Sequence, residues 1–189
     1  FQTFPLGDSA GNEITSGCGY PAIITEASIA GDDSFLPHVA EGIEASAHNE
    51  FTCTSSNANG GQDLVQPQSA FIHAIGLSAL DYATMASDGT ALIWSPRSNI
   101  TLYGDTAQVT TAAALGVQIA LGTDWMPTGS MNMLRELHCA DTFNSTYLNG
   151  YFSDRDLWMM ATTNAANVTA TDDVIGVLAV GKVADISIF

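Results

Sequence analysis

Short apolar runs alternate with amphipathic segments along the chain. Residues 70–74, 90–94 and 117–121 have the length and composition of buried strands, and Phe35-Leu36 closes another such run. Apolar or small residues at helical spacing follow these runs at 44–51, 77–85, 106–115, 129–140 and 155–166. An alternation of strand and helix patterns is typical of β/α units that build a parallel sheet.

Residues that commonly begin and end helices support these boundaries. Ser78 is a candidate N-cap of the helix after residues 70–74, and Ser153 or Asp154 opens the last predicted helix. Gly89 and Gly116 stand where two helices should end. Residues 1–34 are punctuated by glycines, and we assign no chemistry to them.

The surface charge limits the partners that the protein can have. The 189 residues include 4 basic and 20 acidic side chains, which gives a formal net charge of −16. Such a surface repels phosphate backbones and anionic lipid, so we expect neither nucleic acid nor membrane partners. No apolar run reaches the ~18 to 20 residues of a membrane span. We expect a soluble protein, with the cytoplasm favoured over secretion.

Three cysteines are present, Cys18, Cys53 and Cys139, and none has the Cys-x-x-Cys spacing of a metal site. An odd number argues against a complete disulfide framework. We therefore expect buried free thiols, with a bond between Cys18 and Cys53 as the alternative.

Polar, metal-capable residues stand where the predicted strands end. His38 follows Phe35-Leu36, with Glu41 three residues later, and His73 and Asp124 close two other runs. The carboxyl ends of parallel strands meet at one face, where barrel enzymes keep their catalytic groups. Singly, each residue also has a structural explanation, such as a capping aspartate or a hydrogen-bonded histidine. Their shared placement favours the functional interpretation.

This order resembles the amidohydrolase superfamily, in the branch of cytosine, guanine and adenosine deaminases and triazine hydrolases. The likeness rests on His38-x-x-Glu41, on His73, on Pro96-Arg97-Ser98-Asn99 and on Asp124. It continues through Asn164-Ala165-Ala166 and the segment 175–186, so it covers roughly residues 35 to 189. It implies the fold of a TIM-like (β/α)8 barrel.

The resemblance also implies roles for the residues. His38 and Asp124 would bind one divalent metal, zinc ahead of iron. Glu41 would be the acid-base residue and His73 a catalytic residue. The alternative assignment, in which His73 is a second histidine ligand of the metal, stays open. The candidate substrate contacts are Arg97, Asn99 and Trp125. The expected activity is metal-dependent hydrolysis of a non-peptide carbon–nitrogen bond in a small molecule, by deamination or amide hydrolysis.

One departure qualifies this expectation. The family begins with a His-x-His pair that supplies two metal ligands, and this sequence contains no His-x-His. We therefore expect the C-terminal half of a barrel over residues 1–173. Residues 174–189 alternate like strands around a Gly181-Lys182 turn, and they would start the family's small β-sandwich domain. An N-terminal half or a second copy of the chain would complete the fold. The alternative is a non-catalytic half-barrel with a regulatory or structural role.

Overall fold

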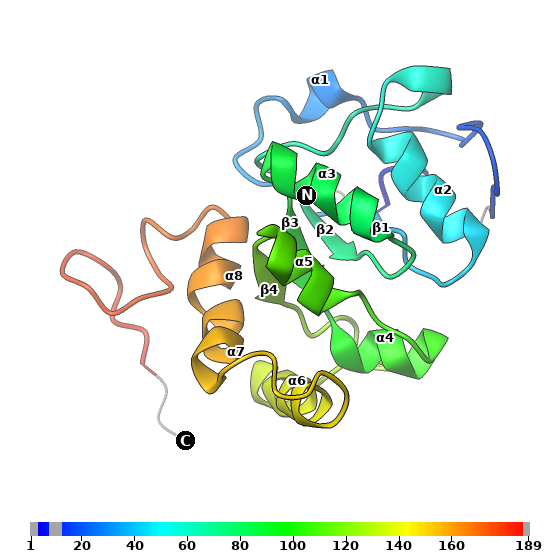
Figure 1. Cartoon of the computed structure of the whole chain (residues 1–189). Coiled ribbons are helices and arrows are strands. Elements are labelled where there is room, and N and C mark those ends of the chain that lie inside the picture. Colours follow the sequence, from blue (N-terminus) through cyan, green and yellow to red (C-terminus); the bar gives the residue numbers. More distant parts are fainter. Residues whose placement is uncertain (1–3, 8–12, 187–189) are drawn as a thin grey trace.

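The computed structural model describes residues 4–7 and 13–186 and contains one four-stranded parallel sheet. Its strands are β1 (His38–Val39), β2 (Ala70–His73), β3 (Ala91–Trp94) and β4 (Ile119–Leu121), and they lie side by side in chain order. Helical crossovers connect them (Figure 1). Sequential parallel strands with helices between them are the arrangement of a (β/α)8 barrel, so the predicted α/β class is confirmed.

The first strand extends beyond the predicted run. A parallel bridge pairs Phe35 with Ser69, and further along His38 and Val39 pair with Ile72 and His73. Phe35-Leu36 is therefore the beginning of this strand pairing, and His38 lies within β1. The register brings the ends of β1 and β2 to the same level.

Each predicted helix has a counterpart near its expected position, whereas the helices Glu26–Ile29 and Pro96–Tyr103 were not predicted from the pattern. Ser78 precedes α3, where its backbone N–H donates to the Asp81 carboxylate at 2.7 Å, and Gly89 ends that helix with φ of 78°. The described helices are α1 (Glu26–Ile29), α2 (Ala45–Thr54), a short 3-10 turn η1 (Ala58–Gly60), α3 (Ala79–Asp88), α4 (Pro96–Tyr103), α5 (Val109–Leu115), α6 (Met133–Tyr147), α7 (Asp154–Ala161) and α8 (Thr163–Val168).

Two of the predicted helices differ clearly from the structure. The helix expected over 129–140 begins later, because the Asn132 side chain accepts the Arg135 N–H at 3.0 Å and caps the first turn. The helix expected over 155–166 is divided into α7 and α8 at Thr162, whose φ of −126° and ψ of −86° are not helical. The predicted opening of α7 is confirmed, since Ser153 and Asp156 form a capping box.

The two faces of the sheet are buried to different degrees. Phe71, Leu92 and Trp94 lie in the main core, which the helices cover. On the opposite face, Ile72 and Ile93 are neighbours in register and are only half-buried. A closed barrel fills this inner face with side chains from all its strands. The described strands thus form part of a barrel, with the inner face partly open.

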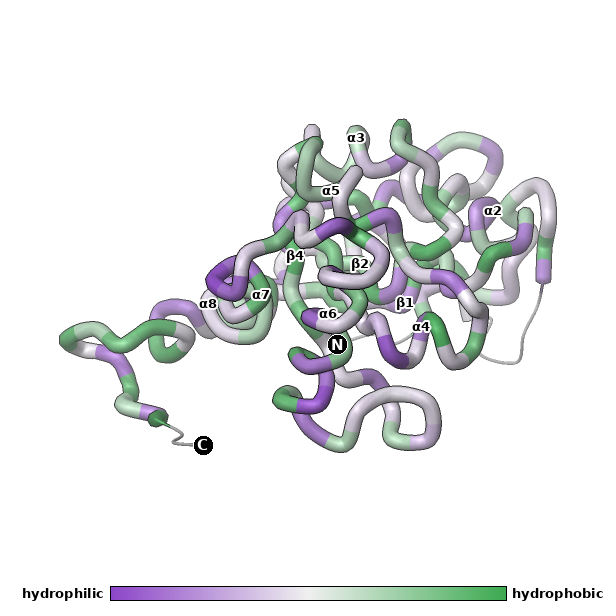
Figure 2. The backbone as a smooth tube through the Cα atoms, turned by 60° about the horizontal axis from the view of Figure 1, so that its bottom comes forward, coloured by the Kyte–Doolittle hydropathy of each residue, from purple (hydrophilic) through white to green (hydrophobic). Residues whose placement is uncertain are grey.

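Residues 174–186 do not form the expected strands. The segment turns back on itself, and the Val183 N–H donates to the Val174 carbonyl at 2.9 Å. It projects from the body after α8 (Figure 1), and Figure 2 shows that much of it is hydrophobic. A strand needs a hydrogen-bonded neighbour, and no described strand lies beside this segment. The last predicted strand positions, 187–189, lie outside the described residues.

The cysteines correct one expectation. Cys18 and Cys53 form a disulfide, and Cys139 is a free thiol. The bond fastens the segment before α1 to α2, and a small apolar cluster around Leu6 and Tyr20 packs there. The pairing depends on two positions 35 residues apart meeting in space, which spacing alone does not reveal. Among the described residues, no helix is long and apolar enough to cross a membrane.

Replacing Cys53 with serine should lower the free energy of unfolding by about 2–4 kcal/mol, because the disulfide restricts the unfolded chain across this loop. Denaturant unfolding of protein purified without reductant measures the change. Cys139→Ser is the matched control, since Cys139 has no disulfide partner. Equal stability of the two variants would show that the bond does not form.

Candidate functional site

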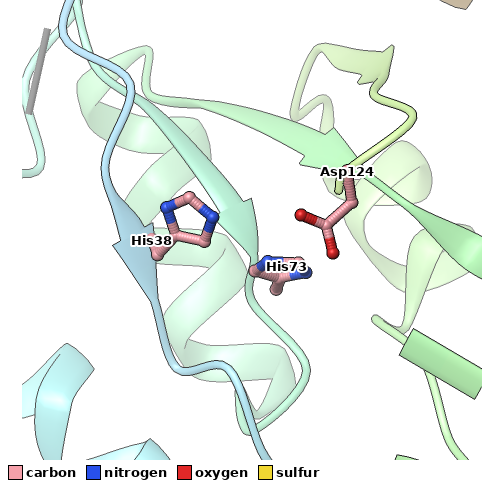
Figure 3. A group of neighbouring side chains, drawn as sticks. All are labelled: His38, His73 and Asp124. Carbon is pink, nitrogen blue, oxygen red and sulfur yellow. The ribbon is translucent and has the colours of Figure 1, made fainter. Parts of the chain in front are cut away.

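The ends of three strands bring together His38, His73 and Asp124. One ligand atom from each lies within 4.8 Å of the other two. His38 belongs to β1, His73 ends β2, and Asp124 follows β4, with its carboxylate turned toward the two imidazole rings (Figure 3). The structure thus gathers the three residues whose placement at strand ends suggested a site. Their roles remain predictions.

The backbone is left-handed at the ends of these strands. His73, Ala74 and Asp124 have φ of 72°, 50° and 54°, and Ala40 in the loop after β1 has φ of 55°. Each such residue that is not glycine costs roughly 1–3 kcal/mol, and strain of this kind gathers at functional sites. Neighbouring bonds offset it. The Ala40 N–H donates to the Glu50 carboxylate at 2.8 Å, and the Ala74 N–H to the Val39 carbonyl at 3.1 Å.

His73 is completely buried and oriented by Asn99. Its Nδ1 lies 2.8 Å from Asn99 Oδ1, while the Asn99 amide donates to Thr106 Oγ1 at 3.0 Å. Since Asn99 Oδ1 accepts, Nδ1 carries the proton and Nε2 presents its lone pair. Nε2 has no hydrogen-bond partner among the described residues. Burial lowers the pKa of His73, so the ring stays neutral at neutral pH. A neutral, aimed imidazole is what a metal ligand requires.

Asp124 is held by the hydroxyl group of Ser98. The buried Ser98 hydroxyl donates to the Asp124 carboxylate and also lies 2.9 Å from Thr128 Oγ1. Ser98 and Asn99 both occupy the first turn of α4, which Pro96 opens. Sequence reasoning noted the Pro96–Asn99 motif but assigned Ser98 no role. The sequence signal for a role of Ser98 was its place inside this motif, directly before Asn99.

Glu41 lies beside the three gathered residues. Its Oε1 is 3.5 Å from His73 Nε2, and the Tyr103 hydroxyl donates to the same oxygen at 3.0 Å. Burial raises the pKa of Glu41, and the bond from Tyr103 lowers it in part. A carboxyl group with a raised pKa close to a polar site suits proton transfer near neutral pH.

The residues expected to contact substrate occupy different environments. Asn99 is fully buried behind His73, with its amide committed to His73 and Thr106, so a direct substrate contact has no support in the structure. Arg97 Nε donates to Ser130 Oγ at 2.8 Å, which directs the guanidinium toward α6. Trp125 is 63% exposed next to Asp124. Substrate contact by Arg97 or Trp125 remains a prediction.

Two aromatic residues near the site were not found from the sequence. The Phe4 ring stacks on His38 with centroids 5.1 Å apart and an angle of 26° between the planes. Tyr103 reaches Glu41 from the far end of α4. Neither contact leaves a local pattern, because each joins positions distant in the chain.

The three gathered side chains fit a divalent metal. Two imidazoles and a carboxylate are ligands that zinc and ferrous iron accept, and ligands of one such ion lie about 3 to 4 Å apart at bonds of ~2.1 Å. In this structure the three ligand atoms all lie within 4.8 Å of one another. The buried Nε2 of His73 has no hydrogen-bond partner among the described residues, and this is the observation that most favours a bound ion.

Comparison with known proteins agrees with the expected family and fold. The family model described as "Amidohydrolase family" matches residues 32–189. A 5-methylthioadenosine/S-adenosylhomocysteine deaminase of Teredinibacter turnerae is 32% identical over 126 residues, which are 65% of this chain and 28% of the deaminase. The enzyme of the same name from Desulforudis audaxviator is 31% identical over 117 residues, 60% of this chain and 27% of its own length.

Solved structures show the same fold. A guanine deaminase of E. coli superposes with a TM-score of 0.66 at 23% identity, over 79% of this chain and 36% of its own. An adenosine deaminase of Xanthomonas campestris with bound zinc has a TM-score of 0.66 at 22% identity, over 80% of this chain and 36% of its own. At this identity the likeness establishes the fold alone. The chain spans about a third or less of the length of each of these relatives.

Asn99→Ala should weaken zinc binding by the protein about 10- to 100-fold, because the His73 ring loses the partner that fixes its tautomer and orientation. Calorimetric titration with zinc measures the affinity. Asn144→Ala is the control, since Asn144 is also a buried amide, bonded to the Phe152 backbone in another part of the fold. The hypothesis fails if both variants bind zinc equally well.

Proposed function

The chain belongs to the amidohydrolase family, and from this premise we propose that its protein is a metal-dependent hydrolase of a non-peptide carbon–nitrogen bond. The observation that carries the proposal is the gathering of His38, His73 and Asp124, with Glu41 beside His73. A deaminase or an amidohydrolase in the narrow sense fits this arrangement. The relatives named as deaminases favour a small molecule that carries an amino group.

His38 and Asp124 would hold the metal, zinc ahead of iron, and His73 would be either a third ligand or a catalytic residue. When bound, a divalent ion acts as a Lewis acid and lowers the pKa of water from ~15.7 to ~7. The zinc in the Xanthomonas campestris structure supports this choice by analogy. The donor set of two imidazoles and a carboxylate suits either ion.

Glu41 would move protons during the reaction. Its carboxylate can accept a proton from the attacking water and then give it to the departing nitrogen, and this exchange leaves the residue unchanged after each turnover. The His73 ring, held by Asn99, would keep its orientation beside Glu41 throughout. If His73 is not a ligand, its ring would orient the water or the developing oxyanion.

We further propose that additional β/α units complete the site. The half-buried Ile72 and Ile93 leave the inner face of the sheet partly open, and the strand β1 has no described neighbour on its outer edge. Exposed edges and apolar faces are normally covered in proteins. The rest of the barrel would come from another part of the same protein or from a second copy of the chain.

A non-catalytic half-barrel is the second candidate, and the lack of a His-x-His pair favours it. One experiment separates the two. The purified full-length protein is stripped of metal, reconstituted with zinc or ferrous iron, and tested for ammonia release from a panel of aminated heterocycles and amides. Metal-dependent release supports the hydrolase. A protein that binds metal but releases no ammonia from any member of the panel overturns it.

Glu41→Gln should lower kcat by ~10² to 10⁴-fold in the full-length enzyme, because the amide cannot carry the proton. Metal content, measured by atomic emission, should stay the same, since Glu41 is not assigned as a ligand. Glu44→Gln removes a nearby exposed carboxylate and should leave turnover unchanged. Unaltered kcat in the Glu41 variant would remove the residue from the mechanism, and loss of metal would make it a ligand.

A further inference from the structure

The helix α4 contacts three members of the candidate site. Ser98 in its first turn donates to Asp124, Asn99 bonds to His73, and Tyr103, its last residue, donates to Glu41. Asn99 and Tyr103 are four residues apart and so lie on the same side of the helix. Two of these three residues belong to the motif that suggested the family. Tyr103 lies outside it.

We propose that Tyr103 is a positioning residue for the proposed reaction and acts by holding Glu41 Oε1, so that Oε2 is left to carry the proton. The inference rests on the proposed function. Its basis is geometric: the phenol hydroxyl is 3.0 Å from Oε1, and the same oxygen faces His73 Nε2 at 3.5 Å. Among the described residues, none is bonded to Oε2 of Glu41.

Several features make Tyr103 suited to this task. Its ring is half-buried, so the hydroxyl has few alternative orientations. Burial and the Glu41 carboxylate raise the pKa of Tyr103 well above its ordinary value, so the phenol keeps its proton and can only donate to the carboxylate. Tyr103 is the last residue of α4, which Gly104 ends with φ of 68°.

The bond also supplies orientation that the loop of Glu41 lacks. Glu41 follows β1 in a segment without regular structure, next to the left-handed Ala40. A glutamate side chain in such a loop has several rotamers available, and ordering it costs conformational entropy. A charge-assisted hydrogen bond from a helix is strong enough to select one of them.

A double-mutant cycle on the full-length, metal-loaded enzyme tests the proposal. Tyr103→Phe removes only the hydroxyl and should lower kcat about 10-fold, the size expected for loss of one hydrogen bond to a charged group. KM and metal per chain should not change. In the Glu41→Gln background, Tyr103→Phe should cause no further loss, because the hydroxyl acts only through the carboxylate. Tyr147→Phe, an exposed tyrosine on α6, is the control.

Two kinetic results would overturn the inference. One is a kcat for Tyr103→Phe that equals the wild-type value. The other is an equal loss of kcat with and without the Glu41 carboxylate, which would mean that Tyr103 acts on the substrate or on the fold.

A second readout does not require turnover. Denaturation midpoints of wild type, Tyr103→Phe, Glu41→Ala and the double variant should be non-additive if the hydroxyl and the carboxylate are bonded. Additive midpoints overturn the contact itself. If the wild-type protein binds metal and lacks all turnover, the proposed function fails together with the catalytic part of this inference, and the midpoints still decide the contact.

Discussion

The hydrogen bond between Asn99 and His73 ties the first turn of α4 to the end of β2 in a completely buried place. Burying two polar side chains is unfavourable unless both are satisfied. Asn99 is satisfied by His73 and Thr106, and Thr106 in turn accepts the indole N–H of Trp94 at 2.8 Å. Nε2 of His73 has no hydrogen-bond partner among the described residues. The network therefore stabilises one orientation of the ring, in which Nε2 lies 3.5 Å from Glu41 Oε1.

The left-handed residues at the strand ends depend on the same surroundings. His73 and Asp124 would favour ordinary extended backbone in isolation, and the structure holds both at positive φ. On α4, Asn99 hydrogen-bonds to the His73 side chain and Ser98 to that of Asp124. The buried core that contains Phe71 and Leu121 fixes the strands that carry His73 and Asp124. The strain is local, while the packing and hydrogen bonds that offset it come from several elements. Such a balance is expected where a site must be held before any ligand arrives.

The open face of the sheet and the apolar segment after α8 have a common physical origin. Ile72 and Ile93 are half-buried, and Leu178 in the segment 174–186 is 71% exposed. Apolar side chains in these positions are stabilised only when another part of a fold covers them. The chain matches its relatives over about a third or less of their length, so the corresponding regions of those proteins have additional structure around them.

Local patterns were enough to predict the alternating strands and helices, the caps at Ser78 and Gly89, and the strand-end placement of His38, His73 and Asp124. Each of these depends on residues close together in the chain, where periodicity and capping preferences act. Only the tertiary structure decided the pairing of Cys18 with Cys53, the burial of Asn99 behind His73, and the bond from Tyr103 to Glu41, 62 residues away. It also decided against strands in 174–186, because a strand forms only beside a partner. Contacts between distant positions depend on how the elements pack, and no local pattern records that packing.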